Sequence, residues 1–234
     1  MTKQKTNYKM AAVTEADIGP VTVEEFRCGT ESFKLMRPAV PERLLDLAAV
    51  ADAYADDEYM PYWATLWPVA KYLTEEVLKH QWPAGTQAIE LGCGLGLPGL
   101  AGLKRGLQVL FTDYDATALK FVEANAALNG FTTLKTELVD WRTPLGQTFE
   151  VILASDLTYE ARNVEPLVAS FDAMLAPQGT VLVADQNRAH SEAFRRALSK
   201  SGFVFEMTQI EVDKSRGRDV PGTVYRIKRS NQPK

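Results

Sequence analysis

Three closely spaced glycines mark the part of this chain whose residue types are best suited to hold a ligand. Residues 89–99 read IELGCGLGLPG, with Gly92, Gly94 and Gly96 between an apolar run and a helical pattern. Glycine has no side chain, so the backbone N–H groups of such a loop can approach a ligand closely. A helix that begins there also directs the positive end of its dipole at the same space. The pattern therefore predicts a turn that binds a nucleotide-like molecule.

Two cofactor signatures fit these glycines. The frame that begins at Gly94 matches G-x-G-x-x-G, the dinucleotide fingerprint, and Asp113 follows at a distance suited to a ribose. The frame that begins at Glu90 matches E-x-G-x-G-x-G, the S-adenosylmethionine signature of the seven-strand methyltransferases. Glu90 favours the second frame, because a carboxylate would repel a pyrophosphate. A sulfonium cofactor carries no phosphate, and the acid can orient the loop or the ammonium group of the cofactor. A glycine turn that only packs a strand against a helix is the third interpretation.

Further acids and aromatic residues end the strands that follow the loop. The run LQVLFTDYD predicts a buried strand that ends at Asp113, with Tyr114 next to it, and a carboxylate there can accept hydrogen bonds from ribose hydroxyl groups. We expect Asp115 to be the N-cap of the following helix. The segment TLKTELVDWRT predicts a third strand with Asp140 and Trp141 at its end. Asp140 either holds the exocyclic amine of adenine beside the indole or caps its own loop.

Two other segments contribute candidate site residues. The fourth predicted strand, FEVILASDLTYE, is apolar up to Ser155 and continues into Asp156 and Tyr159. Such an apolar run is typical of a central parallel strand that is covered on both faces. Before the glycine loop, Trp67 lies just ahead of a helix predicted to begin at Pro68. Trp67 forms either a wall of the ligand site or part of a hydrophobic plug over the sheet edge.

Composition limits the class of protein. A chain of 234 residues with 46% hydrophobic residues suits one ordinary domain. A formal net charge of −4 argues against a general nucleic-acid or membrane binder. No apolar run approaches the length of a membrane span, and the first residues lack a signal-peptide core. Of the two cysteines, Cys28 and Cys93, the second lies inside the glycine loop, where a disulfide would obstruct a ligand. A reducing cytoplasm is therefore expected. A monomer is favoured, and no metal site is predicted.

The order of the predicted elements indicates the fold class. Strands and helices alternate until FVFEMTQIEVD and TVYRIKR, which follow one another with no helix between them and so imply an antiparallel pair. We predict an α/β protein with a Rossmann-like, doubly wound seven-strand sheet and a C-terminal antiparallel hairpin, over residues 61–234. Residues 1–60 are predicted to form an N-terminal extension. It holds an unstructured tail to about residue 20, a hairpin from VTVEEF and SFKLMRP, and one helix over PERLLDLAAVADAYADD.

These motifs together resemble those of the class I seven-β-strand S-adenosylmethionine-dependent methyltransferases. IELGCGLGLPG is similar to the first motif of that class, TDYD to the second, and VDW to the region that frames adenine. Within the class, WATLWPVAKYL and DLTY resemble the lysine-methyltransferase-like family, methyltransferase family 16, whose acid-x-x-aromatic motif falls here on Asp156 and Tyr159. The resemblance covers roughly residues 62–225.

The resemblance implies S-adenosylmethionine as the cofactor and a lysine on a protein substrate as the methyl acceptor. The expected cofactor-binding residues are Trp67, Glu90, Gly92, Cys93, Gly94, Gly96, Asp113, Tyr114, Asp140, Trp141 and Ser155. Asp156 is expected to position the acceptor amine, and Tyr159 to line an aromatic channel with a cation–π contact. Alternatively, Asp156 caps a helix and Tyr159 only packs over the sheet edge.

Three other functions remain open at this point. A methyltransferase for a small molecule or for another protein side chain uses the same fold and cofactor. A catalytically idle cofactor-binding protein would act as an assembly factor. A nicotinamide-dependent enzyme would use the dinucleotide frame of the glycines.

Overall fold

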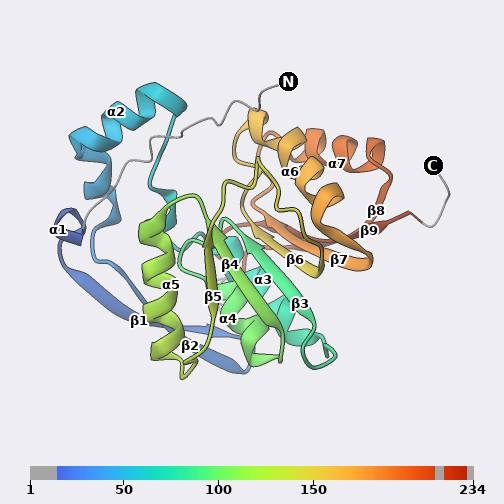
Figure 1. Cartoon of the computed structure of the whole chain (residues 1–234), viewed down its shortest axis with the longest axis horizontal. Helices are drawn as coiled ribbons and strands as arrows, with labels where there is room; N and C mark the ends of the chain where they lie inside the picture. Colours follow the sequence, from blue (N-terminus) through green and yellow to red (C-terminus); the bar gives the residue numbers. More distant parts are fainter. Residues whose placement is uncertain (1–14, 214–218, 231–234) are drawn as a thin grey trace.

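The computed structural model describes residues 15–213 and 219–230, and it is built around a mixed seven-stranded sheet. The strand order is β5-β4-β3-β6-β7-β9-β8 (Figure 1). Strands β3 to β7 run parallel to one another, whereas β9 runs antiparallel to both of its neighbours, β7 and β8. The strands are β3 (Gln87–Leu91), β4 (Gln108–Asp113), β5 (Lys135–Leu138), β6 (Phe149–Ser155), β7 (Leu175–Asp185), β8 (Phe203–Ile210) and β9 (Gly222–Arg229). The predicted doubly wound sheet with a C-terminal antiparallel pair is confirmed.

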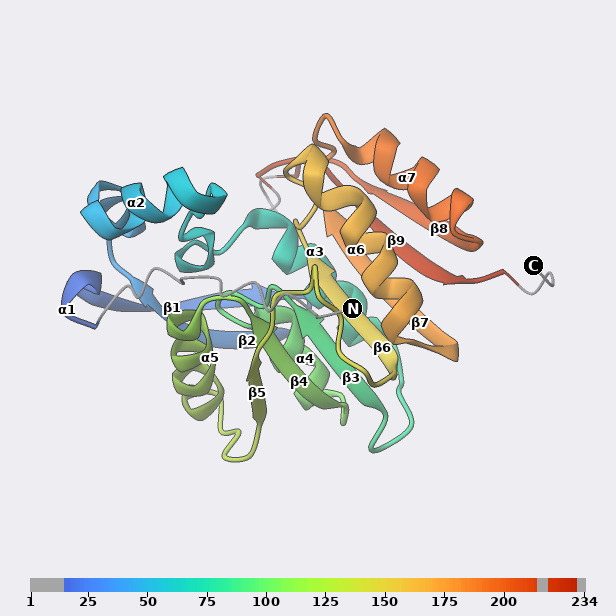
Figure 2. The same ribbon diagram turned by 45° about the horizontal axis from the view of Figure 1, so that its top comes forward.

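Helices cover both faces of this sheet (Figures 1 and 2). One face carries α3 (Pro68–Lys79), α4 (Leu97–Lys104) and α5 (Ala116–Leu128), and the other carries α6 (Ala161–Met174) and α7 (Ser191–Lys200). Successive residues of a strand point to opposite faces. Accordingly, Val109 and Phe111 are buried with the first group of helices and Leu110 with the second. Burial on both faces explains why the central strands read as almost continuous apolar runs.

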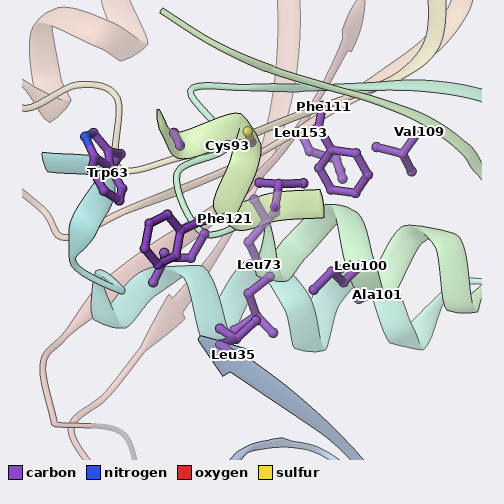
Figure 3. Packing of buried hydrophobic residues seen from close by; sticks show 14 of the residues in the cluster. Leu35, Trp63, Leu73, Cys93, Leu100, Ala101, Val109, Phe111, Phe121 and Leu153 are labelled. Atoms are coloured by element: carbon purple, nitrogen blue, oxygen red, sulfur yellow. The ribbon is translucent and has the colours of Figure 1, made fainter. Parts of the chain in front are cut away.

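The N-terminal extension shares the core of the large sheet. Its hairpin of β1 (Val21–Cys28) and β2 (Glu31–Pro38) forms a separate two-stranded sheet, and Leu35 of β2 lies in the same apolar cluster as Leu73 of α3 (Figure 3). The buried side chain of Asn125, on α5, accepts a hydrogen bond from Met36 N at 2.6 Å. Its amide group donates to Met36 O at 3.2 Å and to Leu95 O at 3.1 Å. One amide side chain thus joins the hairpin, α5 and the loop before α4.

Two short helical segments correct the predictions for the extension. The single helix predicted over residues 41–57 is wrong, because the segment forms a 3₁₀ helix, η1 (Pro41–Asp46), and then α2 (Ala48–Asp57). Leu47 separates them with an extended backbone, φ −73° and ψ 132°. The tail expected to lack structure forms α1 (Glu15–Ile18) at its end, and residues 1–14 of that tail lie outside the described residues. A second 3₁₀ turn, η2 (Tyr62–Ala64), leads into α3.

Strand β7 begins earlier than its sequence suggests. The sequence pattern EPLVASFDAMLAP predicts a helix that ends at Pro177 and Gly179, but α6 ends at Met174 and the strand begins at Leu175. The pairing of β6 with β7 contains a register irregularity, with Phe149 opposite Leu175 and Val151 opposite Thr180. An irregular register accommodates a proline and a glycine that a regular ladder would disfavour.

Within the described residues, no helix is both long and apolar enough to cross a membrane.

Candidate active site

The parallel strands end at a cavity with about 1060 Å³ of space, its open mouth included. In a doubly wound sheet this edge is the expected place for a ligand. The cavity is bounded by the glycine loop, the ends of β4 and β6, the segment from η2 into α3, and the loop after β7. The predicted site residues that line it are Trp67, Glu90, Gly92, Cys93, Gly94, Asp113, Tyr114, Trp141, Ser155, Asp156 and Tyr159. Gly96 and Asp140 lie outside this lining.

The glycine loop presents almost no side chain to the cavity at Gly92 and Gly94. Gly94 has φ +51°, and a Cβ atom there would lie 3.4 Å from Trp63 O. A side chain at Gly94 would therefore be strained and would also point into confined space. Gly96 has another task, because it is the N-cap of α4 and an added Cβ would lie 3.0 Å from Val122.

Three backbone N–H groups of the loop donate to acceptors within the protein. Cys93 N donates to Thr112 O at 2.9 Å, and Gly94 N donates to Asp113 Oδ2 at 2.9 Å. Gly96 N donates to Cys93 O at 2.7 Å. We expected such groups to be directed at a ligand, but these three hold the shape of the loop. The loop contributes bare space more than hydrogen-bond donors.

Glu90 supports the start of α4 from within the cavity wall. Its Oε2 atom accepts a hydrogen bond from Gly99 N at 2.9 Å, and its side chain is almost fully buried. Burial in a low-dielectric environment raises the pKa of this carboxyl group well above its usual value. The contact holds the first turn of α4, and the role of Glu90 in orienting the loop or the cofactor stays a prediction.

Asp113 is buried at the end of β4, and both of its oxygens accept backbone hydrogen bonds. Oδ2 accepts from Gly94 N at 2.9 Å and Oδ1 from Asp115 N at 3.0 Å. Burial raises the pKa of Asp113 to about 7 despite these hydrogen bonds. A carboxylate has about four acceptor positions, so Asp113 retains capacity for ribose hydroxyl groups. Asp115 caps α5 as predicted, because its Oδ1 accepts from Thr117 N at 2.7 Å.

The N-terminal extension holds one wall of the cavity in place. The Tyr114 hydroxyl group donates to Met60 O at 3.0 Å, and the ring of Tyr114 packs edge-on against that of Tyr59, 5.6 Å between centroids. The Tyr59 hydroxyl group in turn donates to the buried Asp115 carboxylate. Residues 59–60, which precede the predicted domain, therefore position Tyr114.

Asp156 has an unusual backbone, and its carboxylate accepts three hydrogen bonds. Its φ of +55° lies in the left-handed region, which few non-glycine residues adopt. Arg188 forms a bidentate pair with it, Nε to Oδ1 at 3.0 Å and Nη2 to Oδ2 at 2.8 Å, and Gln186 Nε2 donates to Oδ2 at 2.5 Å. Asp156 does not cap α6, whose N-cap residue is Glu160. Backbone strain at a cavity is typical of functional residues.

Three aromatic rings form one wall of the cavity. The ring of Tyr159 packs edge-on against that of Tyr62, 5.2 Å between centroids, and Tyr62 packs in the same way against Trp67 at 5.8 Å. Trp67 Nε1 donates to Tyr62 O at 3.1 Å, which fixes the indole. Trp63 is buried against Phe121 in the core, 5.2 Å between ring centroids (Figure 3). Tyr62, Trp67 and Tyr159 thus enclose one side of the cavity.

Asp140 lies beside a smaller cavity that adjoins the large one. Its Oδ1 accepts from Arg142 N at 2.9 Å, and the Arg142 guanidinium group pairs with both carboxylate oxygens. These contacts are those of the loop cap that we considered as the alternative for Asp140. Trp141, the next residue, lines both cavities.

Sequence reasoning missed Arg188, which lines the large cavity. Its guanidinium group lies over the Trp67 ring, 5.5 Å from the centroid, in addition to pairing with Asp156. The feature of the sequence that could have identified Arg188 as a site residue is its position, three residues after the end of the fifth parallel strand. Parallel strands bring such post-strand segments to one edge.

The fold is that of the class I S-adenosylmethionine-dependent methyltransferases. Ribosomal protein L11 methylase from Lactobacillus delbrueckii subsp. bulgaricus matches with a TM-score of 0.58 and 21% identity, over 70% of this chain and 79% of that one. N-methyltransferase NodS from Bradyrhizobium japonicum, solved with S-adenosyl-L-homocysteine, matches with a TM-score of 0.56 and 15% identity, over 70% and 86%.

Sequence comparison identifies the family. The family model described as lysine methyltransferase matches residues 60–201, and the chain belongs to this family, methyltransferase family 16. The electron transfer flavoprotein β-subunit lysine methyltransferase of Danio rerio is 28% identical over 60% of this chain and 56% of that protein. A histidine protein methyltransferase 1 homologue of Dictyostelium discoideum is 26% identical over 62% and 48%. The L11 methyltransferase of Bordetella bronchiseptica is 27% identical over 74% and 54%. The chain spans about half the length of these curated relatives.

S-adenosylmethionine is the cofactor that this family implies, and the cavity residues fit it. The lining at Gly92 and Gly94, and the spare acceptor positions of Asp113, suit an amino-acid chain and a ribose. The Oγ atom of Ser155 is buried without a hydrogen-bond partner in the described part of the chain. An unpaired buried hydroxyl group at a cavity is suited to a polar group of a ligand.

Proposed function

We propose that this protein transfers a methyl group from S-adenosylmethionine to the side-chain amine of a lysine in a protein substrate. The family match and the lysine methyltransferase among the relatives support this assignment. The observation that carries it is the placement of the D-x-x-Y motif. Asp156 and Tyr159 follow β6 and line the same cavity as the glycine loop. A methyl acceptor held there would lie beside a cofactor held by the loop.

The cofactor-binding residues expected from the sequence are part of this proposal. Asp113 would accept hydrogen bonds from the ribose, and the space beside Gly92 and Gly94 would hold the amino-acid portion. Trp141 and Tyr114 would border the adenine ring. Gly96, outside the cavity lining, would act through the start of α4. We also retain the division between an extension, residues 1–60, and a methyltransferase domain, residues 61–234.

Asp140 would contact adenine only from the adjoining cavity. In the large cavity, the remaining proposed cofactor-binding residues are Cys93, Trp67 and Ser155. Glu90 would act through its hydrogen bond to Gly99 N, and so through the shape of the loop.

The pairing of Asp156 with Arg188 suits a neutral amine. When bound, S-adenosylmethionine supplies a methyl group activated by its positive sulfur atom. Lysine attacks only after losing its proton, because an ammonium group has no lone pair. An isolated carboxylate would favour the protonated form of a nearby amine. In this site Arg188 neutralises Asp156, so the carboxylate can orient an amine without holding it as an ammonium.

The aromatic wall has two effects on the same acceptor. The faces of Tyr62, Trp67 and Tyr159 are apolar and exclude water from the approach of the amine. They can also hold a methylated, positively charged product through cation–π attraction. A narrow, dry approach of this kind lowers the entropic cost of methyl transfer.

Labelling of a cell lysate with tritiated S-adenosylmethionine tests the proposal. We expect labelled protein bands with the wild-type protein, and mass spectrometry of the excised bands should place the methyl groups on lysine. Asp156→Ala should lower the rate of labelling by on the order of a hundredfold, because a misplaced acceptor reacts slowly. Cofactor affinity should change far less. Glu192→Ala removes a carboxylate from an exposed position on α7 and should leave the rate unchanged.

Other outcomes of the same experiment assign the other functions. Methyl groups on histidine or another side chain would keep the methyltransferase and discard lysine, and the histidine methyltransferase among the relatives keeps this alternative in view. Labelled small solutes would indicate a small-molecule substrate. Cofactor binding without any transfer would favour an assembly factor. A binding titration with NAD tests the nicotinamide alternative, and we expect no saturable binding.

A further inference from the structure

Arg188 is the single basic side chain among the described residues that line the large cavity. It lies between β7 and α7, in a segment that sequence reasoning left without a role. The ionisable acids around the cavity are Glu90, Asp113, Asp156 and Glu160. A ligand with a carboxylate therefore finds one basic side chain there, which is already paired with Asp156 along one edge of its guanidinium group.

The guanidinium group of Arg188 is held rigidly. Two hydrogen bonds join Nε and Nη2 to the Asp156 carboxylate, whose side chain is only 2% exposed. On one flank the group lies over the Trp67 ring, 5.5 Å from its centroid. A bidentate pair and a stacked face fix the plane of a guanidinium group. A side chain that is already ordered loses little entropy when it binds a ligand.

Part of the guanidinium group still has donors to offer. Arginine carries five N–H donors. The structure gives Nη1 of Arg188 no hydrogen-bond partner among the described residues, and the side chain is 32% exposed. Pairing with Asp156 raises the pKa of Arg188, so the group stays charged. The free edge matches the planar, two-oxygen geometry of a carboxylate.

Three N–H donors of the glycine loop, those of Cys93, Gly94 and Gly96, are used within the protein, as described above. The cofactor that the family implies has one carboxylate, at its amino-acid end, whereas the proposed acceptor brings an amine. The cofactor is thus the ligand whose charge matches Arg188.

We propose that Arg188 binds the carboxylate of the amino-acid portion of S-adenosylmethionine, through the edge of its guanidinium group that Asp156 leaves free. The inference rests on the proposed function, since it requires the cofactor in this cavity. In this arrangement Arg188 connects the two ends of the site. One edge holds the cofactor, and the other holds the carboxylate proposed to orient the acceptor.

Calorimetric binding of two cofactor forms tests the proposal without an acceptor. The probes are S-adenosylmethionine and its decarboxylated analogue, which differ only in the carboxylate. We expect the wild-type protein to bind the intact cofactor more tightly, by roughly tenfold to a hundredfold, the scale of a hydrogen bond to a charged group. Arg188→Gln should lose this preference and bind the analogue as well as the wild type does. Arg188→Lys, which keeps the charge without the planar fork, should retain part of the preference.

Arg196→Gln is the matched control, because Arg196 is 71% exposed on α7 and pairs only with Glu192 among the described residues. It should bind both probes as the wild type does. Equal losses of affinity for both probes in Arg188→Gln would overturn the inference, and so would an unchanged preference for the intact cofactor. If Arg188→Gln does not fold, the test uses the affinities of Arg188→Lys and of the wild type for the two probes. A wild type that does not prefer S-adenosylmethionine over its decarboxylated analogue refutes the assignment of Arg188. A wild type that binds neither probe refutes the proposed function itself.

Discussion

The raised pKa of Asp113 makes cofactor binding sensitive to pH. The free protein holds this carboxyl group buried, with a pKa of about 7 against a usual value of 3.8. Hydrogen bonds from ribose hydroxyl groups would favour the ionised carboxylate, so binding should lower the pKa and release a proton. The affinity for S-adenosylmethionine should therefore fall as the pH falls through 7.

The size of the effect follows from the fraction of ionised carboxylate. With a pKa of about 7, about nine tenths of the free protein is ionised at pH 8 and about one tenth at pH 6. The affinity should thus fall about tenfold between these pH values, or about 1.4 kcal/mol. Asp113→Asn should remove this dependence and weaken binding at pH 8 by roughly 1–3 kcal/mol, because a neutral amide is a poorer acceptor.

The stability of the ligand-free protein also reports the ionisation of Asp113. The contribution of this group to stability should fall as the pH rises, whereas the affinity for the cofactor should rise. Between pH 3.8 and about 7 the folded state binds one more proton at Asp113 than the unfolded chain does, so this group makes the free energy of unfolding fall as the pH rises. From pH 6 to pH 8 its share of the fall is about 1.4 kcal/mol. We therefore compare the two ligand-free proteins at each pH. The free energy of unfolding of Asp113→Asn minus that of the wild type should be about 1.4 kcal/mol larger at pH 8 than at pH 6.

Titration calorimetry at pH 6, 7 and 8 measures the affinities, and urea unfolding at the same pH values measures the stabilities. Glu90 is also a buried carboxyl group with a raised pKa, and the cofactor has ionisable groups of its own. Both are present in the two proteins, but the charge of Asp113 contributes to the raised pKa of Glu90, so the difference between wild type and Asp113→Asn reports Asp113 together with this coupling. The reasoning is refuted if the wild-type affinity does not vary with pH, or if Asp113→Asn retains the same slope.

Three further substitutions have defined expectations. Gly94→Val should abolish measurable cofactor binding while the fold persists by circular dichroism, because φ is +51° and the side chain would meet Trp63 O; normal binding would place the loop away from the ligand. Tyr159→Phe should slow lysate labelling by less than about tenfold, since the ring contact with Tyr62 remains; a far larger loss would mean that the hydroxyl group contacts the acceptor. Asn125→Ala should lower the free energy of unfolding by about 2–3 kcal/mol in urea, because it leaves two part-buried backbone groups of Met36 and the buried carbonyl group of Leu95 without this partner; a negligible change would mean that water replaces the amide.

Local pattern was sufficient for the parts of the fold that depend on neighbouring residues. Apolar runs, turn glycines and helical spacing predicted the alternation of strands and helices, and the missing helix near the C-terminus predicted that β9 is antiparallel. Asp115 as a helix cap followed from its place in the chain. The order of parallel strands then requires their carboxyl ends to share one edge. This is why Asp113, Asp156 and the glycine loop could be assigned to one site before any coordinates.

Only the tertiary structure decided which side chains meet. Arg188 pairs with Asp156, 32 residues away in the sequence, and Asn125 bonds Met36, 89 residues away. Such contacts depend on how loops and the hairpin pack, and no periodicity records them. The same limit explains Asp140, whose loop turns its carboxylate toward Arg142 and the smaller cavity. Residue type and strand order predict which edge of the sheet a group reaches, whereas packing in three dimensions determines its partner.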